Sequence, residues 1–161
     1  MILFNRTRNS TARMLDDNIL LITSSLLDSM HEMELSIRVD LKDRTILDAD
    51  FEMKRAPYTF CFDVADRAAG LKGFNVFEWN KVKRLYQALA GRDGCLQLAD
   101  LAVEGIKIVN PSILATMYGG RAEMLKTFDR MLQGTCYSHS RPPEEKIKAA
   151  YSLVPGRLDA S

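Results

Sequence analysis

Three residues of types that bind metals or attack electrophiles lie at predicted boundaries between elements of secondary structure. His31 comes just after the turn that starts a strand, Cys61 follows the last strand, and Cys95 starts a helix. The macrodipole and free backbone amides at a helix start favour the thiolate form of a cysteine, which binds metal and attacks electrophiles. One imidazole and two thiolates suit zinc or an iron–sulfur cluster with a fourth position open.

Two other hypotheses fit the same three residues. An activated Cys61 or Cys95 with His31 as its base would make a thiol-dependent enzyme. Alternatively, the chain is a non-catalytic protein-interaction module. In that case the cysteines are packing residues, since cysteine is among the most buried residue types, and His31 is a rim histidine bonded to a backbone carbonyl. The long gaps between the three residues match no compact ligand motif.

Further groups accompany these residues. Cys136 and His139 have the spacing Cys-x-x-His on a predicted loop, where they either face solvent or supply an additional ligand. Four carboxylates near the cysteines are candidate acids, bases or partners of a metal ligand. Two of them, Asp63 and Asp93, also lie where carboxylates usually stabilise the start of a helix, which is their structural interpretation. The four carboxylates are Asp63, Asp66, Asp93 and Asp100.

The elements that must position these residues begin with strands. Apolar and polar residues alternate between Asn18 and Lys54, the period of half-buried strands. The pattern predicts a three-stranded antiparallel meander over 18–27, 30–40 and 47–54 with one wet face. The residues expected on its apolar face are His31, Met33, Leu35, Ile37, Val39, Leu47, Ala49, Phe51 and Met53.

Helices are predicted to follow the sheet, which Pro57 ends because proline cannot donate to a ladder. The fold class is therefore α+β, a single domain over 1–137 with a tail over 138–161, and the helices cover the apolar face of the sheet. The expected helices run from Phe60 to a stop at Gly70 and Gly73, from Trp79 to Leu89, from Cys95 to Asn110, from Asn110-Pro111 onward, and from Arg121 to Leu132.

Composition narrows the classes of function. The 161 residues carry a formal charge of +1, without the basic excess that binds nucleic acid. No apolar run approaches the length of a membrane span, and three cysteines make no disulfide framework. We therefore expect a cytoplasmic protein with neither a nucleic-acid nor a membrane partner. The sequence leaves open whether the protein has a protein partner. It also does not specify the oligomeric state, any substrate or the identity of the metal.

Three short motifs resemble a bacterial family of domains of unknown function numbered 2889. They are Met30-His31-Glu32-Met33, Ala56-Pro57-Tyr58 followed by Cys61, and Arg92-Asp93-Gly94-Cys95. The resemblance runs from about Phe4 to about Ser138. In that family the last motif tends to read Gly-Cys-Thr-His-Leu, so Gln97 stands here where the family has a histidine.

The order of segments is also similar to that of the iron–sulfur scaffold proteins of the NifU and IscU type. Those proteins run as a meander followed by helices, and their three cysteines occupy places that correspond to His31, Cys61 and Cys95. The short motifs around the scaffold cysteines are absent. This resemblance implies a scaffold-like fold and a small metal- or cluster-binding accessory protein with His31, Cys61 and Cys95 as ligands.

Overall fold

The computed structural model describes residues 1–117, 127, 129–142 and 144–146 of the chain. They belong to two compact units, Met1–Ser112 and Ile113–Ser161. The first unit holds the sheet and all three predicted metal ligands. The predicted division into a domain over 1–137 and a tail over 138–161 stays a prediction.

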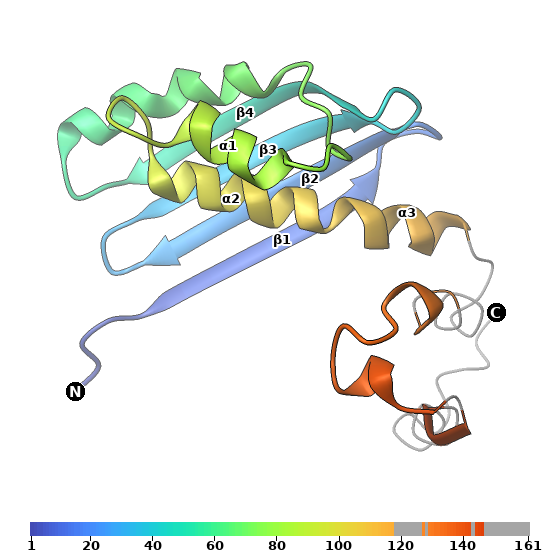
Figure 1. The fold of residues 1–161 in the computed structure, drawn as a ribbon. Coiled ribbons are helices and arrows are strands. Elements are labelled where there is room, and N and C mark those ends of the chain that lie inside the picture. Colours follow the sequence, from blue (N-terminus) through green and yellow to red (C-terminus); the bar gives the residue numbers. More distant parts are fainter. Residues whose placement is uncertain (118–126, 128, 143, 147–161) are drawn as a thin grey trace. The chain divides into compact units, whose positions relative to one another are not determined.

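A four-stranded antiparallel sheet forms the base of the first unit, and its strands are neighbours in chain order (Figure 1). The α+β class and the antiparallel meander are confirmed, but the predicted number of three strands is wrong. The additional strand is the first one, where Arg6, Arg8 and Ser10 alternate on one face in place of apolar residues. It therefore lacks the apolar period that revealed the other strands. The strands are β1 (Arg6–Met14), β2 (Ile19–Asp28), β3 (Glu32–Asp40) and β4 (Thr45–Arg55).

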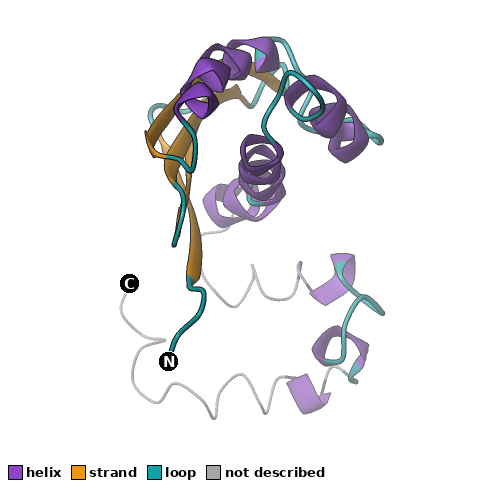
Figure 2. Ribbon diagram, turned by 90° about the vertical axis from the view of Figure 1, so that its left-hand side faces the viewer, coloured by secondary structure: helices purple, strands orange, loops and turns teal. Residues whose placement is uncertain are grey.

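Helices lie on one side of this sheet (Figure 2). We call the covered side the inner face and the opposite side the outer face. The helix α2 (Leu96–Lys107) packs mainly on β2 and β3, and the 3-10 helix η1 (Thr59–Leu71) packs on β4. The helix α1 (Lys81–Leu89) packs on α2 and η1. A layer of helices on one face of an antiparallel sheet is the arrangement that the wet outer face predicts.

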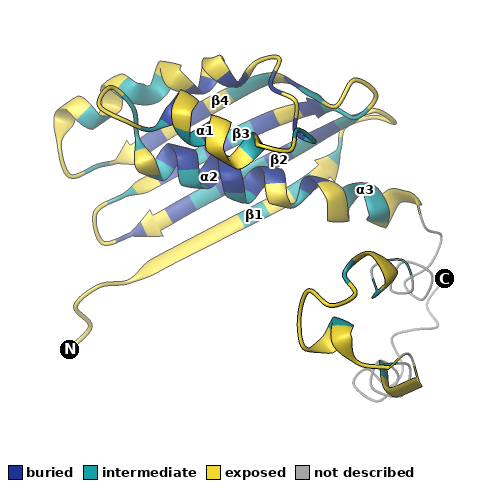
Figure 3. Ribbon diagram, viewed as in Figure 1, coloured by how far each residue is buried: buried dark blue, intermediate teal, exposed yellow. Residues whose placement is uncertain are grey.

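The core lies between the inner face and α2 (Figure 3). Each residue buried there leaves water, which is the main stabilising contribution to such a fold. The sheet residues of the core include every second position of β2 and β3, as the alternation of apolar and polar residues predicts. The buried residues are Leu20, Ile22, Leu26, Met33, Leu35, Ile37 and Val39 of the sheet and Leu98, Leu101, Ala102 and Ile106 of α2.

One predicted inward residue of β4 faces outward instead. Leu47 is 36% exposed, whereas its neighbour Ile46 is 1% exposed and belongs to the core. The register between β3 and β4 shifts at this point, because Arg38 pairs with Asp48 while the next residue, Val39, pairs with Ile46. This bulge inserts one extra residue into β4, so the side chain of Leu47 lies on the outer face and not on the inner face.

The helix predicted from Trp79 to Leu89 is shorter in the structure. It begins at Lys81, and Trp79 is 99% exposed in the preceding turn. Leu85 and Leu89 are buried, whereas Val82 on the same helix is exposed. The predicted stop is wrong at Gly70, which lies inside η1. η1 ends at Leu71, just before Gly73, whose φ of 78° suits glycine.

The predicted helix from Cys95 to Asn110 corresponds to α2, for which Cys95 is the N-cap residue. The next helix, α3 (Val109–Met117), begins one residue before the predicted Asn110. A 3-10 turn, η2 (Ser138–Ser140), belongs to the second unit. Much of the helix predicted from Arg121 to Leu132, and of the tail, lies outside the described residues. No helix in the described part has both the length and the apolar composition that crossing a membrane requires.

Candidate functional site

The three predicted metal ligands lie on three separate elements. His31 lies in the turn between β2 and β3, Cys61 is the third residue of η1, and Cys95 is the N-cap of α2. All three lie toward one end of the sheet. His31 and Cys61 are there because Glu32, which follows His31, pairs with Arg55 at the end of β4, just before η1. Cys95 is there because Gln97, in the first turn of α2, bonds to Arg8 near the start of β1.

The described residues do not gather these ligands into a formed metal centre. Within residues 1–117, 127, 129–142 and 144–146, no group of three His, Cys, Asp or Glu side chains is placed to hold a metal ion. The thiols of Cys61 and Cys95 are free and partly buried. A metal site formed by His31, Cys61 and Cys95 therefore stays a prediction.

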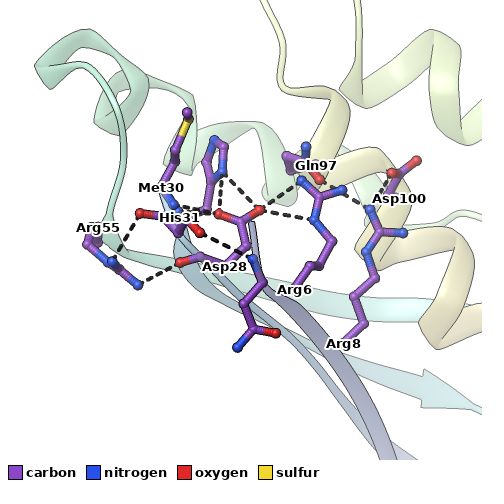
Figure 4. Close-up of polar contacts among 10 residues, drawn as sticks. Arg6, Arg8, Asp28, Met30, His31, Arg55, Gln97 and Asp100 are labelled. Atoms are coloured by element: carbon purple, nitrogen blue, oxygen red, sulfur yellow. Dashed lines mark hydrogen bonds and ion pairs between the residues drawn. The ribbon is translucent and has the colours of Figure 1, made fainter. Parts of the chain in front are cut away.

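A buried carboxylate that the sequence reasoning missed organises this end of the sheet (Figure 4). The side chain of Asp28, the last residue of β2, has no exposed surface. Its Oδ1 accepts hydrogen bonds from the backbone N–H groups of Met30 at 2.8 Å and His31 at 2.7 Å. Its Oδ2 accepts from Nε and Nη2 of Arg6 at 3.0 and 2.8 Å. One carboxylate thus holds β1 and the β2–β3 turn together.

The imidazole ring of His31 also contacts this carboxylate. Its Nδ1 lies 3.1 Å from Oδ1 of Asp28, and its side chain is 18% exposed. The ring is thereby oriented, and Nε2 is the nitrogen on the side away from Asp28. A carboxylate that orients a histidine in this way is common behind general bases and behind metal-bound histidines.

The environment of Asp28 keeps it ionised. Burial acts to raise the pKa of this carboxyl, but the hydrogen bonds from the backbone N–H groups of Met30 and His31 and from Arg6 and His31 act against it. The result is a pKa far below the usual 3.8. A buried, charged carboxylate with all these donors is a structural clamp at neutral pH.

A second ion pair ties β1 to α2. Nη2 of Arg8 donates to Oδ2 of Asp100 at 2.7 Å and to Oε1 of Gln97 at 3.2 Å, while the Tyr86 hydroxyl donates to Oδ1 of Asp100 at 2.6 Å. Burial acts to raise the pKa of Asp100, but the Tyr86 and Arg8 hydrogen bonds hold it below its usual value. Asp100, a candidate acid or base from the sequence, is thus engaged in packing α1, α2 and β1.

The outer edge of β1 offers unpaired backbone groups. The N–H of Leu15 bonds the carbonyl of Ile19, and the carbonyl of Asn5 accepts from Ser29. Because hydrogen-bonded pairs alternate along an antiparallel ladder, the odd-numbered residues of β1 bond to β2. The even-numbered residues direct their N–H and C=O groups away from the sheet. Those residues are Arg6, Arg8, Ser10, Ala12 and Met14.

Among the described residues, this edge has no partner strand. We call it the free edge. β1 is coloured as largely exposed along its length (Figure 3). The sequence reasoning did not find it, although the spacing Arg-x-Arg-x-Ser at its start places three side chains on one face of an extended chain.

Two hollows mark the surface of the first unit. One is bounded by Arg44, Asn75, Phe77, Glu78 and Arg84, and is wide open to solvent. The other lies on the outer face among seven residues and is shallow. Neither hollow encloses a small substrate or borders Cys61 or Cys95. The residues around the second hollow are Ser25, Leu26, Leu27, Glu32, Met33, Glu34 and Lys54.

The predicted Cys136 and His139 pair lies in the second unit. Cys136 is exposed, and Nδ1 of His139 faces Oδ1 of Asp129 at 3.1 Å. Nζ of Lys146 donates to the same oxygen at 2.6 Å. Hydrogen bonds from Lys146 and His139 lower the pKa of the Asp129 carboxyl. His139 is therefore part of an ion-paired cluster.

Comparison with known proteins gives one match. A family described as a protein of unknown function, DUF2889, matches residues 12–109. The matched segment contains His31, Cys61 and Cys95 and runs from the end of β1 to the start of α3. No curated protein and no solved structure matches the chain. The expected likeness to the NifU and IscU scaffolds has no support from these comparisons.

Proposed function

This chain belongs to the DUF2889 family, whose function is unknown, and from its geometry we propose that it is a protein-interaction module. In this proposal it binds a partner polypeptide as an added strand along the free edge of β1. The observation that carries the proposal is the row of outward backbone groups on Arg6, Arg8, Ser10, Ala12 and Met14. Strand addition at an open sheet edge is a recurring mode of peptide recognition, in which main-chain hydrogen bonds supply the affinity.

The free edge is rigid enough to act as a template. The register of β1 against β2 is continuous from Arg6 to Met14, and the strand contains neither proline nor glycine. The ion pairs of Arg6 with Asp28 and of Arg8 with Asp100 hold the first part of β1 in place. A preordered strand loses little conformational entropy on binding, which favours affinity.

Catalysis has weaker support than binding. The hollow bounded by Phe77 is wide open and the one bounded by Lys54 is partly open, whereas substrate sites are usually concave and enclose most of the ligand. The ionised carboxylates Asp28 and Asp100 are held by several donors each, so neither is free to move a proton near neutral pH. These observations favour the interaction module over the thiol-dependent enzyme.

Peptides selected from a displayed random library against the full chain test the proposal. Residue-resolved hydrogen exchange then locates the bound peptide. We expect it to protect the N–H groups of Arg8, Ser10 and Ala12, which point outward, and to leave those of Asn9 and Thr11 unchanged.

Two variants control this test. Ala12→Pro removes one outward donor and should weaken peptide binding at least tenfold, whereas Asn9→Ala, on the outer face, should leave it unchanged. Selected peptides that leave the Arg8, Ser10 and Ala12 amides unprotected would contradict strand addition at β1.

The metal site is a second candidate, favoured by the pairing of Asp28 with His31. Metal-binding histidines commonly donate their other ring N–H to a carboxylate, and Nδ1 of His31 faces Asp28 in this manner. His31, Cys61 and Cys95 would be the ligands of zinc or of an iron–sulfur cluster, which binds cysteine thiolates. This candidate requires the three side chains to approach one another further.

Elemental analysis of protein purified without oxygen tests the second candidate. We expect near-stoichiometric zinc or iron, most of it lost in Cys61→Ser and in Cys95→Ser. Cys136→Ser, in the second unit, is the matched control and should keep the metal. Metal content that is the same in all three variants as in the wild type would contradict the metal site.

A further inference from the structure

We propose that the strand bound at the free edge is β1 of a second copy of this chain, paired antiparallel about Ser10. This inference rests on the proposed function, because it names the partner of the same edge. In the pairing, Ser10 faces Ser10 of the second copy, Arg8 faces Ala12, and Arg6 faces Met14. The two sheets then join into one.

Hydrogen-bond geometry favours this register. The outward residues of β1 are the five even-numbered ones, and Ser10 is the middle one. A two-fold axis at Ser10 therefore pairs all five residues with five of the second copy. The pairing forms about ten backbone hydrogen bonds, the number that a typical specific interface carries. A slip by two residues would leave Arg6 or Met14 without a partner, so the proposed register satisfies the most groups.

The positions of the arginines are compatible with the same register. Directly opposed like charges destabilise a pair of antiparallel strands. About Ser10, Arg8 faces Ala12 and Arg13 faces Thr7, so none of the three arginines of β1 faces another arginine. Arg6 and Arg8 also bring their own counterions, Asp28 and Asp100. The second copy thus meets an edge on which two of the three arginines, Arg6 and Arg8, are already paired.

The helices leave room for the second copy. A two-fold axis perpendicular to the sheet keeps both inner faces on the same side. With strands about 4.8 Å apart, β2 and its copy would be roughly 14 Å apart. Because α2 packs more on β2 and β3 than on β1, the two α2 helices would be about that far apart over most of their length. Packed helix axes need only about 8–10 Å, so no clash results.

The edge lacks several of the features that commonly prevent pairing of identical strands. Natural edges are protected by proline, charged side chains, a bulge or a very short strand. β1 has nine residues, an unbroken register with β2 and no proline, and of its three arginines the two on the inner face, Arg6 and Arg8, are paired with Asp28 and Asp100.

Sedimentation of the full chain over a concentration series tests the dimer, and substitutions at Ala12 test its register. Ala12→Arg places an arginine opposite Arg8 twice in each dimer and should raise the dissociation constant about tenfold. Ala12→Glu should lower it. Thr11→Arg, on the outer face opposite Asn9, is the matched control and should leave the dissociation constant within about twofold. The melting temperature of each variant monitors its fold.

A disulfide measures the register directly. In a chain whose three native cysteines are replaced by serine, Ser10→Cys should form a disulfide-linked dimer on oxidation, because opposed Cα atoms in such a pair are about 5.5 Å apart. Thr7→Cys should form none, since its copies would be roughly 20 Å apart.

Each negative outcome separates this inference from the proposed function. A monomer at every concentration whose Arg8, Ser10 and Ala12 amides become protected by selected peptides overturns the dimer and leaves strand addition standing. A monomer whose amides are protected without any peptide means that the chain's own second unit covers the edge, which overturns both. A dimer that is insensitive to both charges at Ala12 overturns the register about Ser10.

Discussion

The two edge strands of the sheet differ in what lies against them. β4 is covered along its side by η1, and its first residue, Thr45, forms an isolated bridge with Asn75. β1, at the other edge, has no partner strand among the described residues, and its side chains are mostly exposed. We call the β4 edge the covered edge. One sheet thus combines an edge partly covered by its own chain with an edge that has no partner strand among the described residues.

Different interactions hold the two edges in place. The covered edge is packed by apolar side chains such as Phe51 and Met53, which are 6% and 8% exposed. The free edge is attached by ion pairs on its inner face, from Arg6 to Asp28 and from Arg8 to Asp100. A partner strand can therefore be accepted at the free edge without disturbing the core. This contrast suggests that stability resides toward β4 and binding toward β1.

The largest predicted effect contrasts one inward residue at each edge. Phe51→Asp places a charge in the core under the helices and should unfold the domain, because an unpaired buried charge costs several kcal/mol. Leu35→Asp, in the neighbouring β3, should do the same. Ala12→Asp, at the half-buried inner face of β1, should cost no more than about 1 kcal/mol. Thermal unfolding followed by circular dichroism measures all three. An unchanged melting temperature for Phe51→Asp would mean that the sheet faces are assigned in reverse.

The next effect concerns the anchor of the free edge. Asp28→Asn should lower the free energy of unfolding by about 2–3 kcal/mol at neutral pH, since it removes a buried charge bonded to Arg6 and to two backbone N–H groups. Urea unfolding measures the loss. The conservative Glu32→Gln, on the exposed start of β3, is its control and should change stability little.

The same variant predicts a pH dependence. Burial raises the pKa of Asp28, but the hydrogen bonds from the backbone and Arg6 outweigh it and hold this pKa below the 3.8 of an unfolded chain. The stabilising contribution of Asp28 is therefore complete above that value. The contribution is lost as the pH falls through the lowered pKa. The stability difference between wild type and Asp28→Asn should therefore be constant near neutral pH and shrink below about pH 4. A difference that grows on acidification would mean that Asp28 is protonated in the folded protein.

Proline substitutions distinguish the side of β1 that bonds to β2 from the side that faces away from the sheet. Thr11 directs its N–H to β2, and Ala12 directs its N–H away from the sheet. Thr11→Pro should cost about 2 kcal/mol or more, because it removes a ladder hydrogen bond and leaves an acceptor unpaired. Ala12→Pro should fold with nearly wild-type stability. Equal losses in urea unfolding of the two variants would contradict the assigned facing of the β1 amides.

The smallest predicted effect compares ion pairs at the inner and outer faces. Arg8→Ala removes a partly buried pair with Asp100 and should cost about 1 kcal/mol. Arg38→Ala removes a solvent-exposed pair with Asp48 on the outer face and should leave the melting temperature unchanged within error. A larger loss for Arg38→Ala than for Arg8→Ala would mean that the outer face is covered.

Most of the sheet was predictable because its inner face is apolar. Val39, Ile37 and Leu35 alternate with polar residues, and the structure buries them as the alternation predicts. β1 was not predictable, because an edge strand needs little apolar surface and this one uses arginines on its inner face. Leu47 was misplaced because a bulge leaves no trace in the alternation.

The candidate site was predictable in part. Sequence position placed His31, Cys61 and Cys95 at the ends of elements, where the structure also has them. The pairing of Asp28 with Arg6 was not foreseen, because these residues are far apart in the sequence and only the register of β1 brings them together. The free edge follows from the order of strands, which local patterns do not specify.

Residue-resolved hydrogen exchange of the full chain at low and high concentration tests the central claim most directly. In dilute protein we expect the Asn9 and Thr11 amides to be protected by β2 and the Arg8, Ser10 and Ala12 amides to exchange at nearly unprotected rates. At high concentration the Arg8, Ser10 and Ala12 amides should become protected as well. Protection of these three amides that is present in dilute protein and independent of concentration would contradict a free edge that accepts a partner strand.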